Sequence, residues 1–162
     1  MSISLRKMTS NEYDEFFKWS RNNHVKELIK DTNMSLEDAL SQTEVEVKEM
    51  LPDGINTENN SLMVIENVLD NRNVGFMWYL YEETHGVQQV FLCDLVIDEL
   101  ERRKGYATEA LYVMEQNATE FGCKECVLFV AKENEPAQRL YSKNGYIFLK
   151  EMDYGMYLKK KL

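Results

Sequence analysis

The sequence predicts one α/β domain with a mixed, mostly antiparallel sheet of about seven strands flanked by four helices. Length is the first observation behind this prediction, since 162 residues with 44% hydrophobic content supply one core and are few for two. The second is periodicity, because apolar residues recur at helical spacing in some segments and in strand-like runs in others. The third is their order along the chain, β-α-α-β-β-β-α-β-α-β-β. We therefore expect residues 1–162 to form a single domain.

The first third of the chain is predicted to be one strand followed by two helices. Residues 3–8 alternate as a short strand does. Thr9 or Ser10 can cap a helix that continues to about residue 30. Ser35 opens a second helix with an S-x-x-[DE] box, and that helix ends at residues 52–54, Pro-Asp-Gly. Its apolar stripe is expected to comprise Leu36, Ala39, Leu40, Val47, Met50 and Leu51.

Strand-like segments dominate the rest of the chain. Residues 61–68, 74–82 and 87–97 are rich in Val, Ile, Tyr, Phe and Trp, which predicts three consecutive antiparallel strands. A helix is expected from about Gly105 to a C-terminal cap at Gly122, then a strand over 125–131 and a helix over 134–144. Residues 146–160 are expected to form two strands around a turn near Glu151.

Composition and charge exclude several classes of function. A formal net charge of −9 opposes nucleic acid and anionic membranes as partners. The sequence has neither a long apolar run nor a basic-then-apolar start, so we expect a cytoplasmic location. Three cysteines suit a reducing compartment. Cys123 and Cys126 form a C-x-x-C without the further ligands that zinc needs, so no metal is expected. We expect the two cysteines to be buried, and a redox pair is the alternative.

A basic segment stands at the start of the helix near Gly105. The preceding strand ends at Ile97, so residues 98–104 form a turn that leads into free helix N–H groups and the positive end of a helix dipole. Such a place binds anions, and Gly105 permits backbone to approach the ligand closely. Residues 102–104, Arg-Arg-Lys, add charge that favours a diphosphate over one carboxylate. The phosphate-binding patterns G-x-x-x-x-G-K-[ST] and G-x-G-x-x-G are absent.

Two segments carry a resemblance to a known family. The pattern R-x-x-G-x-A at 102–107 and the segment NEPAQRLYSKNGY at 134–146 resemble the signatures of the GNAT superfamily of acyl-CoA-dependent N-acetyltransferases. The chain is similar to small bacterial members whose acceptor is unassigned. The resemblance implies a GNAT-like fold, acetyl-CoA as cosubstrate, and direct attack by a primary amine in a ternary complex. The amine would belong to a small molecule or a protein, with a homodimer as the family-level expectation.

The resemblance also implies roles for individual residues. Backbone near Ile97 would hold the acetyl carbonyl and the pantetheine arm, which Asn134 would also contact. Tyr141 would stand near the sulfur and protonate the leaving thiolate. Backbone N–H groups of Arg103 to Thr108 would hold the pyrophosphate, with Arg102 and Arg103 as charge partners. The cofactor-binding segment would thus comprise Arg102, Arg103, Lys104, Gly105, Tyr106, Ala107 and Thr108.

The general base is left open between two carboxylates. An alkyl ammonium titrates near ~10.4, so some group must take its proton before it attacks a thioester. Asp94 and Glu66 are the candidates. Asp94 precedes Ile97 by three residues, so the two face opposite sides unless a bulge intervenes, and the family usually has a bulge there. The alternative function is a non-catalytic module of the same fold that binds acyl-CoA or a partner protein. Acceptor specificity is expected in residues 22–60 and the last turn.

Overall fold

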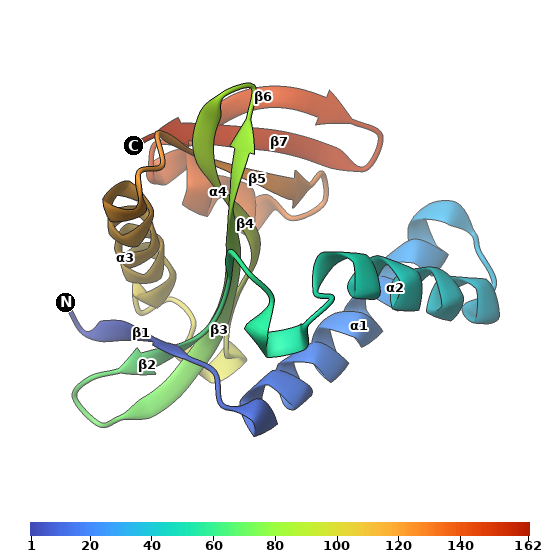
Figure 1. Cartoon of the computed structure of the whole chain (residues 1–162), viewed down its shortest axis with the longest axis horizontal. Helices are drawn as coiled ribbons and strands as arrows, with labels where there is room; N and C mark the ends of the chain where they lie inside the picture. The colour runs from blue at the N-terminus through green and yellow to red at the C-terminus, as the bar shows by residue number, and fades with distance from the viewer. The chain divides into compact units, whose positions relative to one another are not determined.

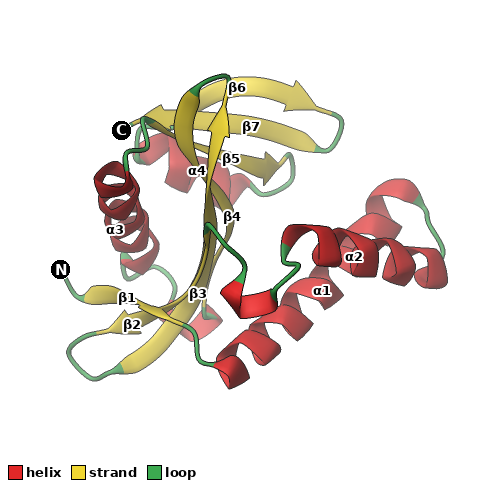
Figure 2. Cartoon of the chain, viewed as in Figure 1, coloured by secondary structure: helices red, strands yellow, loops and turns green.

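A computed structural model of the chain describes residues 1–162 and contains four α-helices and one seven-stranded sheet (Figures 1 and 2). The element order is that expected from the sequence, and the α/β fold class is confirmed. The elements are β1 (Ile3–Lys7), α1 (Ser10–Thr32), α2 (Leu36–Met50), β2 (Asn60–Asn67), β3 (Arg72–Thr84), β4 (Val87–Ile97), α3 (Tyr106–Phe121), β5 (Glu125–Ala131), α4 (Glu135–Lys143), β6 (Ile147–Met152) and β7 (Gly155–Lys161). Short 3-10 turns occupy Gly54–Asn56 and Glu99–Glu101. No helix is both long and apolar enough to cross a membrane.

The sheet has the strand order β1-β2-β3-β4-β5-β7-β6. Every neighbouring pair is antiparallel except β4 and β5, which run parallel. A parallel pair needs a crossover connection, and α3 supplies it between these two strands. The parallel pairing is short, joining only Gln89–Leu92 to Glu125–Leu128.

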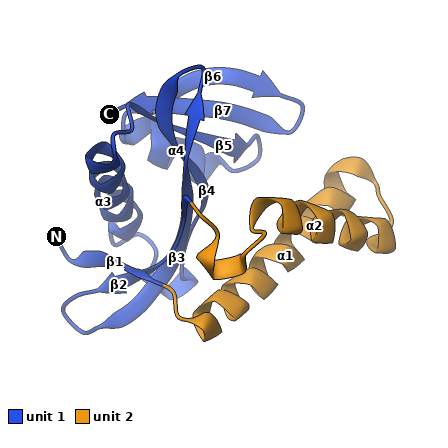
Figure 3. Ribbon diagram, viewed as in Figure 1, with its two compact units in different colours: residues 1–7, 59–162 blue, residues 8–58 orange.

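The chain divides into two compact units, residues 8–58 and residues 1–7 with 59–162 (Figure 3). In the larger unit, α3 and α4 contribute to one hydrophobic cluster with the sheet. Leu111 and Met114 of α3 are almost fully buried there, beside Met77 of β3 and Leu92 of β4. Leu111 and Met114 thus mark the buried side of α3, whereas Phe121 at its end is exposed.

The smaller unit contains α1 and α2. Thr9 caps α1 in a capping box: its hydroxyl accepts from the Glu12 N–H, and its own N–H donates to the Glu12 carboxylate. Ser35 caps α2 as expected, accepting from the Asp38 N–H at 3.1 Å. The apolar stripe predicted on α2 is wrong in part, because Leu36, Leu40 and Met50 are exposed. Helical spacing finds an apolar face, but burial depends on what packs against it.

The last hairpin turns later than predicted. β6 continues to Met152, which pairs with Gly155, so the turn comprises Asp153 and Tyr154 instead of a position near Glu151. Gly155 explains the register, because a Cβ there would lie 2.3 Å from the Val130 carbonyl oxygen of β5. Close approach of β7 to β5 therefore requires glycine at the first position of β7.

Candidate active site

The pairing between β4 and β5 stops part-way along both strands, and the unpaired stretch beyond it is here named the opening. Leu92 and Leu128 are the last paired residues, and Cys93 is an extra residue in β4, because Leu92 pairs with Tyr79 and Asp94 with Trp78. A bulge of this kind bends a strand away from its neighbour. The β4 edge from residue 93 to 97 consequently has no strand partner on the β5 side.

The position of this bulge corrects the expectation for Asp94. The bulge precedes Asp94 instead of lying between Asp94 and Ile97, and pairing with β3 is regular over that interval. Ile97 packs against the helix-covered core, so alternation puts Asp94 on the other face of the sheet. Asp94 and Ile97 thus both lie on the unpaired stretch of β4, with their side chains on opposite faces of the sheet.

The start of α3 provides free hydrogen-bond donors. The first intrahelical bond runs from the Glu109 N–H to the Gly105 carbonyl, and no side chain caps the helix. The N–H groups of Tyr106, Ala107 and Thr108 therefore have no acceptor within the chain. Gly105 has φ of 88°, and a Cβ built there would meet nothing within 4 Å. Free donors beside open space suit the diphosphate of a CoA ester.

The three adjacent cations have different partners. The Arg102 Nε donates to the carbonyl of Ile97 at 3.1 Å. Lys104 forms an ion pair of 2.9 Å with Glu101. Only Arg103 has a side chain with no hydrogen bond or ion pair in the chain. Two of the three cations, Arg102 and Lys104, therefore already make contacts within the chain.

Tyr141 is the buried side chain of α4. It is 8% exposed, and its ring packs edge-on against Tyr146 at 5.6 Å between centroids. Burial raises the pKa of Tyr141, and electrostatic interactions with Cys126 and Asp94 raise it further. The phenol thus keeps its proton across the neutral range.

Two other predicted site residues have clear structural partners. Asn134 caps α4, its Oδ1 accepting from the Ala137 N–H at 3.2 Å. Glu66 forms an ion pair of 3.0 Å with Arg6 of β1. Two strand spacings and four residues along the strand separate Glu66 from Asp94, roughly 16 Å between Cα atoms. The structure therefore does not bring Glu66 together with Asp94.

Two buried acids were not singled out from the sequence. Glu101 is 8% exposed and Glu115 is 7% exposed. Glu115 accepts from the Tyr146 hydroxyl at 3.0 Å and from the Lys160 ammonium at 2.7 Å, so it fixes the ring against which Tyr141 packs. A signal for it was present, namely a carboxylate on the apolar face of a helix. For Glu101 the signal was its spacing three residues before Lys104.

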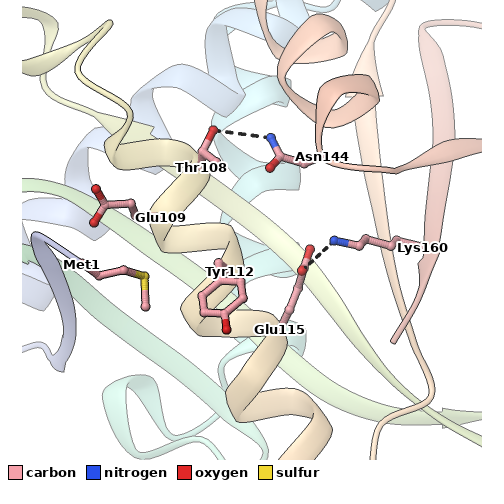
Figure 4. A pocket seen from close by; sticks show the side chains of 7 residues that line it. All are labelled: Met1, Thr108, Glu109, Tyr112, Glu115, Asn144 and Lys160. Carbon is pink, nitrogen blue, oxygen red and sulfur yellow. Dashed lines mark hydrogen bonds and ion pairs between the residues drawn. The ribbon is translucent and has the colours of Figure 1, made fainter.

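A hollow lies on α3 apart from the opening (Figure 4). Thr108 of α3 accepts a long hydrogen bond, 3.4 Å, from Asn144 at its edge, and the Glu115–Lys160 ion pair lies on another side. No residue of β4 or β5 lines it. The lining residues are Met1, Thr108, Glu109, Tyr112, Glu115, Asn144 and Lys160.

The C-x-x-C pair lies in the interior. Cys123 and Cys126 are free thiols, 2% and 0% exposed, and burial raises the pKa of both, that of Cys126 to about 12. A redox or ligand thiol needs access and a lowered pKa. The chain also contains no group of three or more His, Cys, Asp or Glu side chains placed to hold a metal. The burial interpretation therefore describes this pair.

Comparison with known proteins decides the family. The model of the acetyltransferase (GNAT) family matches residues 13–146. This chain belongs to the GNAT family. It is accordingly an acetyl-CoA-dependent N-acetyltransferase, as the two signature segments led us to expect.

Two relatives from Bacillus subtilis are similar over most of this GNAT chain. YdgE, an uncharacterized N-acetyltransferase, is 30% identical over 146 residues, 90% of this chain and 92% of YdgE. YycN, also an uncharacterized N-acetyltransferase, is 29% identical over 147 residues, 90% of this chain and 93% of YycN. The crystal structure of YycN matches with a TM-score of 0.80, covering 95% of this chain and 96% of that one.

A more distant structure shows the same fold with a ligand. PaiA N-acetyltransferase from Thermoplasma acidophilum, in complex with coenzyme A, matches with a TM-score of 0.71 at 18% identity over all of both chains. Acetyl-CoA is the cosubstrate consistent with this family and fold.

Proposed function

We propose that residues 1–162 act as one GNAT-type domain that moves the acetyl group of acetyl-CoA to a primary amine by direct attack in a ternary complex. The amine belongs to a small molecule or to a protein. The observation that carries the proposal is the end of β4–β5 pairing after Leu92 and Leu128, which leaves the edge of β4 free beyond that point. The free N–H donors of α3 and the raised pKa of Tyr141, to which Asp94 contributes, support it. The net charge of −9 supports a cationic amine over nucleic acid or membrane as partner. The proposed location of the protein is the cytoplasm.

Binding uses backbone more than side chains. The N–H groups from Arg103 to Thr108 hold the diphosphate, with the unengaged Arg103 guanidinium as its charge partner. The unpaired β4 edge near Ile97 receives the pantetheine arm as an added strand. Asn134 contacts the arm through its amide nitrogen, since its oxygen caps α4.

The chain supplies proton transfer and orientation. Acetyl-CoA supplies an acetyl group activated as a thioester. Asp94, just past the bulge, takes the proton of the bound ammonium directly or through a water. Backbone N–H groups at the bulged strand donate to the carbonyl oxygen. Tyr141 holds a proton on its hydroxyl and delivers it to the departing sulfur, a role that its raised pKa supports.

Calorimetric titration tests the binding half of this proposal. We expect acetyl-CoA and CoA to bind with a stoichiometry of one per chain. A screen of amines for thiol release then tests turnover. Binding without release for any amine, including peptide N-termini, would favour the non-catalytic module instead. A folded chain that binds neither ligand would contradict the assigned site. Sedimentation of the same sample tests the expected homodimer.

A further inference from the structure

Glu101 directly precedes the proposed diphosphate loop, residues 102–108. It is 8% exposed, whereas each of the following four residues is exposed. One carboxylate oxygen accepts from Arg72 and the other from Lys104, the latter at 2.9 Å. Arg72 also donates to Asp70 at 2.8 Å. A single buried carboxylate thus joins the loop to the first residue of β3.

This carboxylate needs both cations. Removing a carboxylate from water is unfavourable unless charge partners and hydrogen bonds replace the water. Arg72 and Lys104 are each about half exposed, with side chains 52% and 48% accessible, so neither depends on Glu101 for solvation. Glu101 is therefore the buried member of the cluster, and the two cations converge on it.

The backbone that follows Glu101 contains two residues with positive φ. Arg103 has φ of 64° and Gly105 has φ of 88°. A non-glycine residue with positive φ persists when its surroundings hold it. Arg103 has such a tether on each side, the Arg102 contact to the Ile97 carbonyl and the Lys104 ion pair with Glu101. The free N–H groups at the start of α3 follow this segment immediately.

We propose that Glu101 is a positioning residue for the diphosphate of acetyl-CoA. Its carboxylate bridges Arg72 and Lys104, and this bridge keeps residues 103–105 in the conformation that presents the free N–H groups to the phosphates. It also engages the Lys104 ammonium, which leaves Arg103 as the cation that meets the ligand. This inference rests on the proposed cofactor site.

The sign of the effect distinguishes positioning from simple charge. Glu101→Gln removes a negative charge beside the site, which by Coulomb attraction alone would strengthen binding of a diphosphate. Positioning predicts the opposite. We expect Glu101→Gln to weaken acetyl-CoA binding about tenfold, the effect of losing one charge-assisted contact that orders the loop. Glu99→Gln removes the same charge from an exposed position in the same turn and is the matched control, with affinity unchanged.

A ligand without the diphosphate completes the experiment. Acetyl-pantetheine keeps the thioester and the arm, so its affinity should be equal in the wild type and in Glu101→Gln. Arg72→Gln should also weaken acetyl-CoA binding, because Glu101 then loses one of its two cations. Thermal melting of each variant checks that the chain is folded.

The outcomes distinguish failure of the proposed function from failure of the positioning role of Glu101. If the wild type does not bind acetyl-CoA, the proposed function itself fails. If the wild type binds and Glu101→Gln binds equally or more tightly, only the positioning role is overturned. Equal weakening of acetyl-CoA and acetyl-pantetheine would also overturn it, because that result is a general loss of structure.

Discussion

Gly105 is the position where one added side chain tests the diphosphate site most directly. We expect Gly105→Asp to abolish measurable acetyl-CoA binding while the chain stays folded. A Cβ added at Gly105 meets no protein atom within 4 Å, so the new side chain starts in open space, which is the space assigned to phosphate. Gly122→Asp is a matched control, since Gly122 has φ of 109°, also meets nothing within 4 Å, and lies at the other end of α3.

The magnitude follows from backbone strain and charge. An L-residue in the left-handed region costs about 1–2 kcal/mol of folding free energy, and this cost applies to both variants. At Gly105 a carboxylate about 5 Å from one phosphate charge adds a repulsion of about 0.8 kcal/mol in water and about 3 kcal/mol at an effective dielectric constant of 20. Those values correspond to about 4-fold and about 200-fold weaker binding per phosphate charge.

Two measurements give the result. Thermal melting checks that both variants stay folded, and Gly122→Asp should lose more stability because its carboxylate opposes the dipole at the C-terminal end of α3. Calorimetry then compares acetyl-CoA affinity, which should be lost in Gly105→Asp and retained in Gly122→Asp. Retained affinity in Gly105→Asp, or equal loss in both variants, would refute the reasoning that puts the diphosphate at the start of α3.

Three further predictions concern catalysis and stability. Tyr141→Phe should keep acetyl-CoA affinity and lower turnover by about 10²–10⁴-fold in a thiol-release assay, and unchanged turnover would remove its role as acid. Asp94→Asn should lower turnover near neutral pH. Glu66→Gln should lose only its partly exposed ion pair with Arg6, about 1 kcal/mol of stability, and the reverse pattern would make Glu66 the base. Because burial raises the Cys126 pKa to about 12, its stability contribution is complete below the unfolded thiol pKa of about 8.5 and is lost as pH rises toward 12. Cys126→Ala should flatten the decline of the melting temperature between pH 8.5 and 10, and an unchanged decline would contradict this linkage.

Local patterns explain why the elements and the family were predictable. The Ser35 cap, the glycine that ends α3 and the apolar runs of β2 to β4 each act within a few residues, so they are visible in the sequence. The two signature segments are also continuous stretches. They predicted the loop at the start of α3 and the helix that carries Tyr141.

The sequence by itself determined the order of helices and strands, the membership in the GNAT family and the segment that we propose for the diphosphate. Tertiary structure alone decided which charged side chains of that segment are already paired within the chain, since Arg72 contacts Glu101 from 29 residues away in the sequence. It also separated Asp94 from Glu66 and put the bulge at Cys93, because strand register is set by pairing between distant segments. Such contacts depend on which segments the fold brings together, and no local pattern of residues encodes that choice.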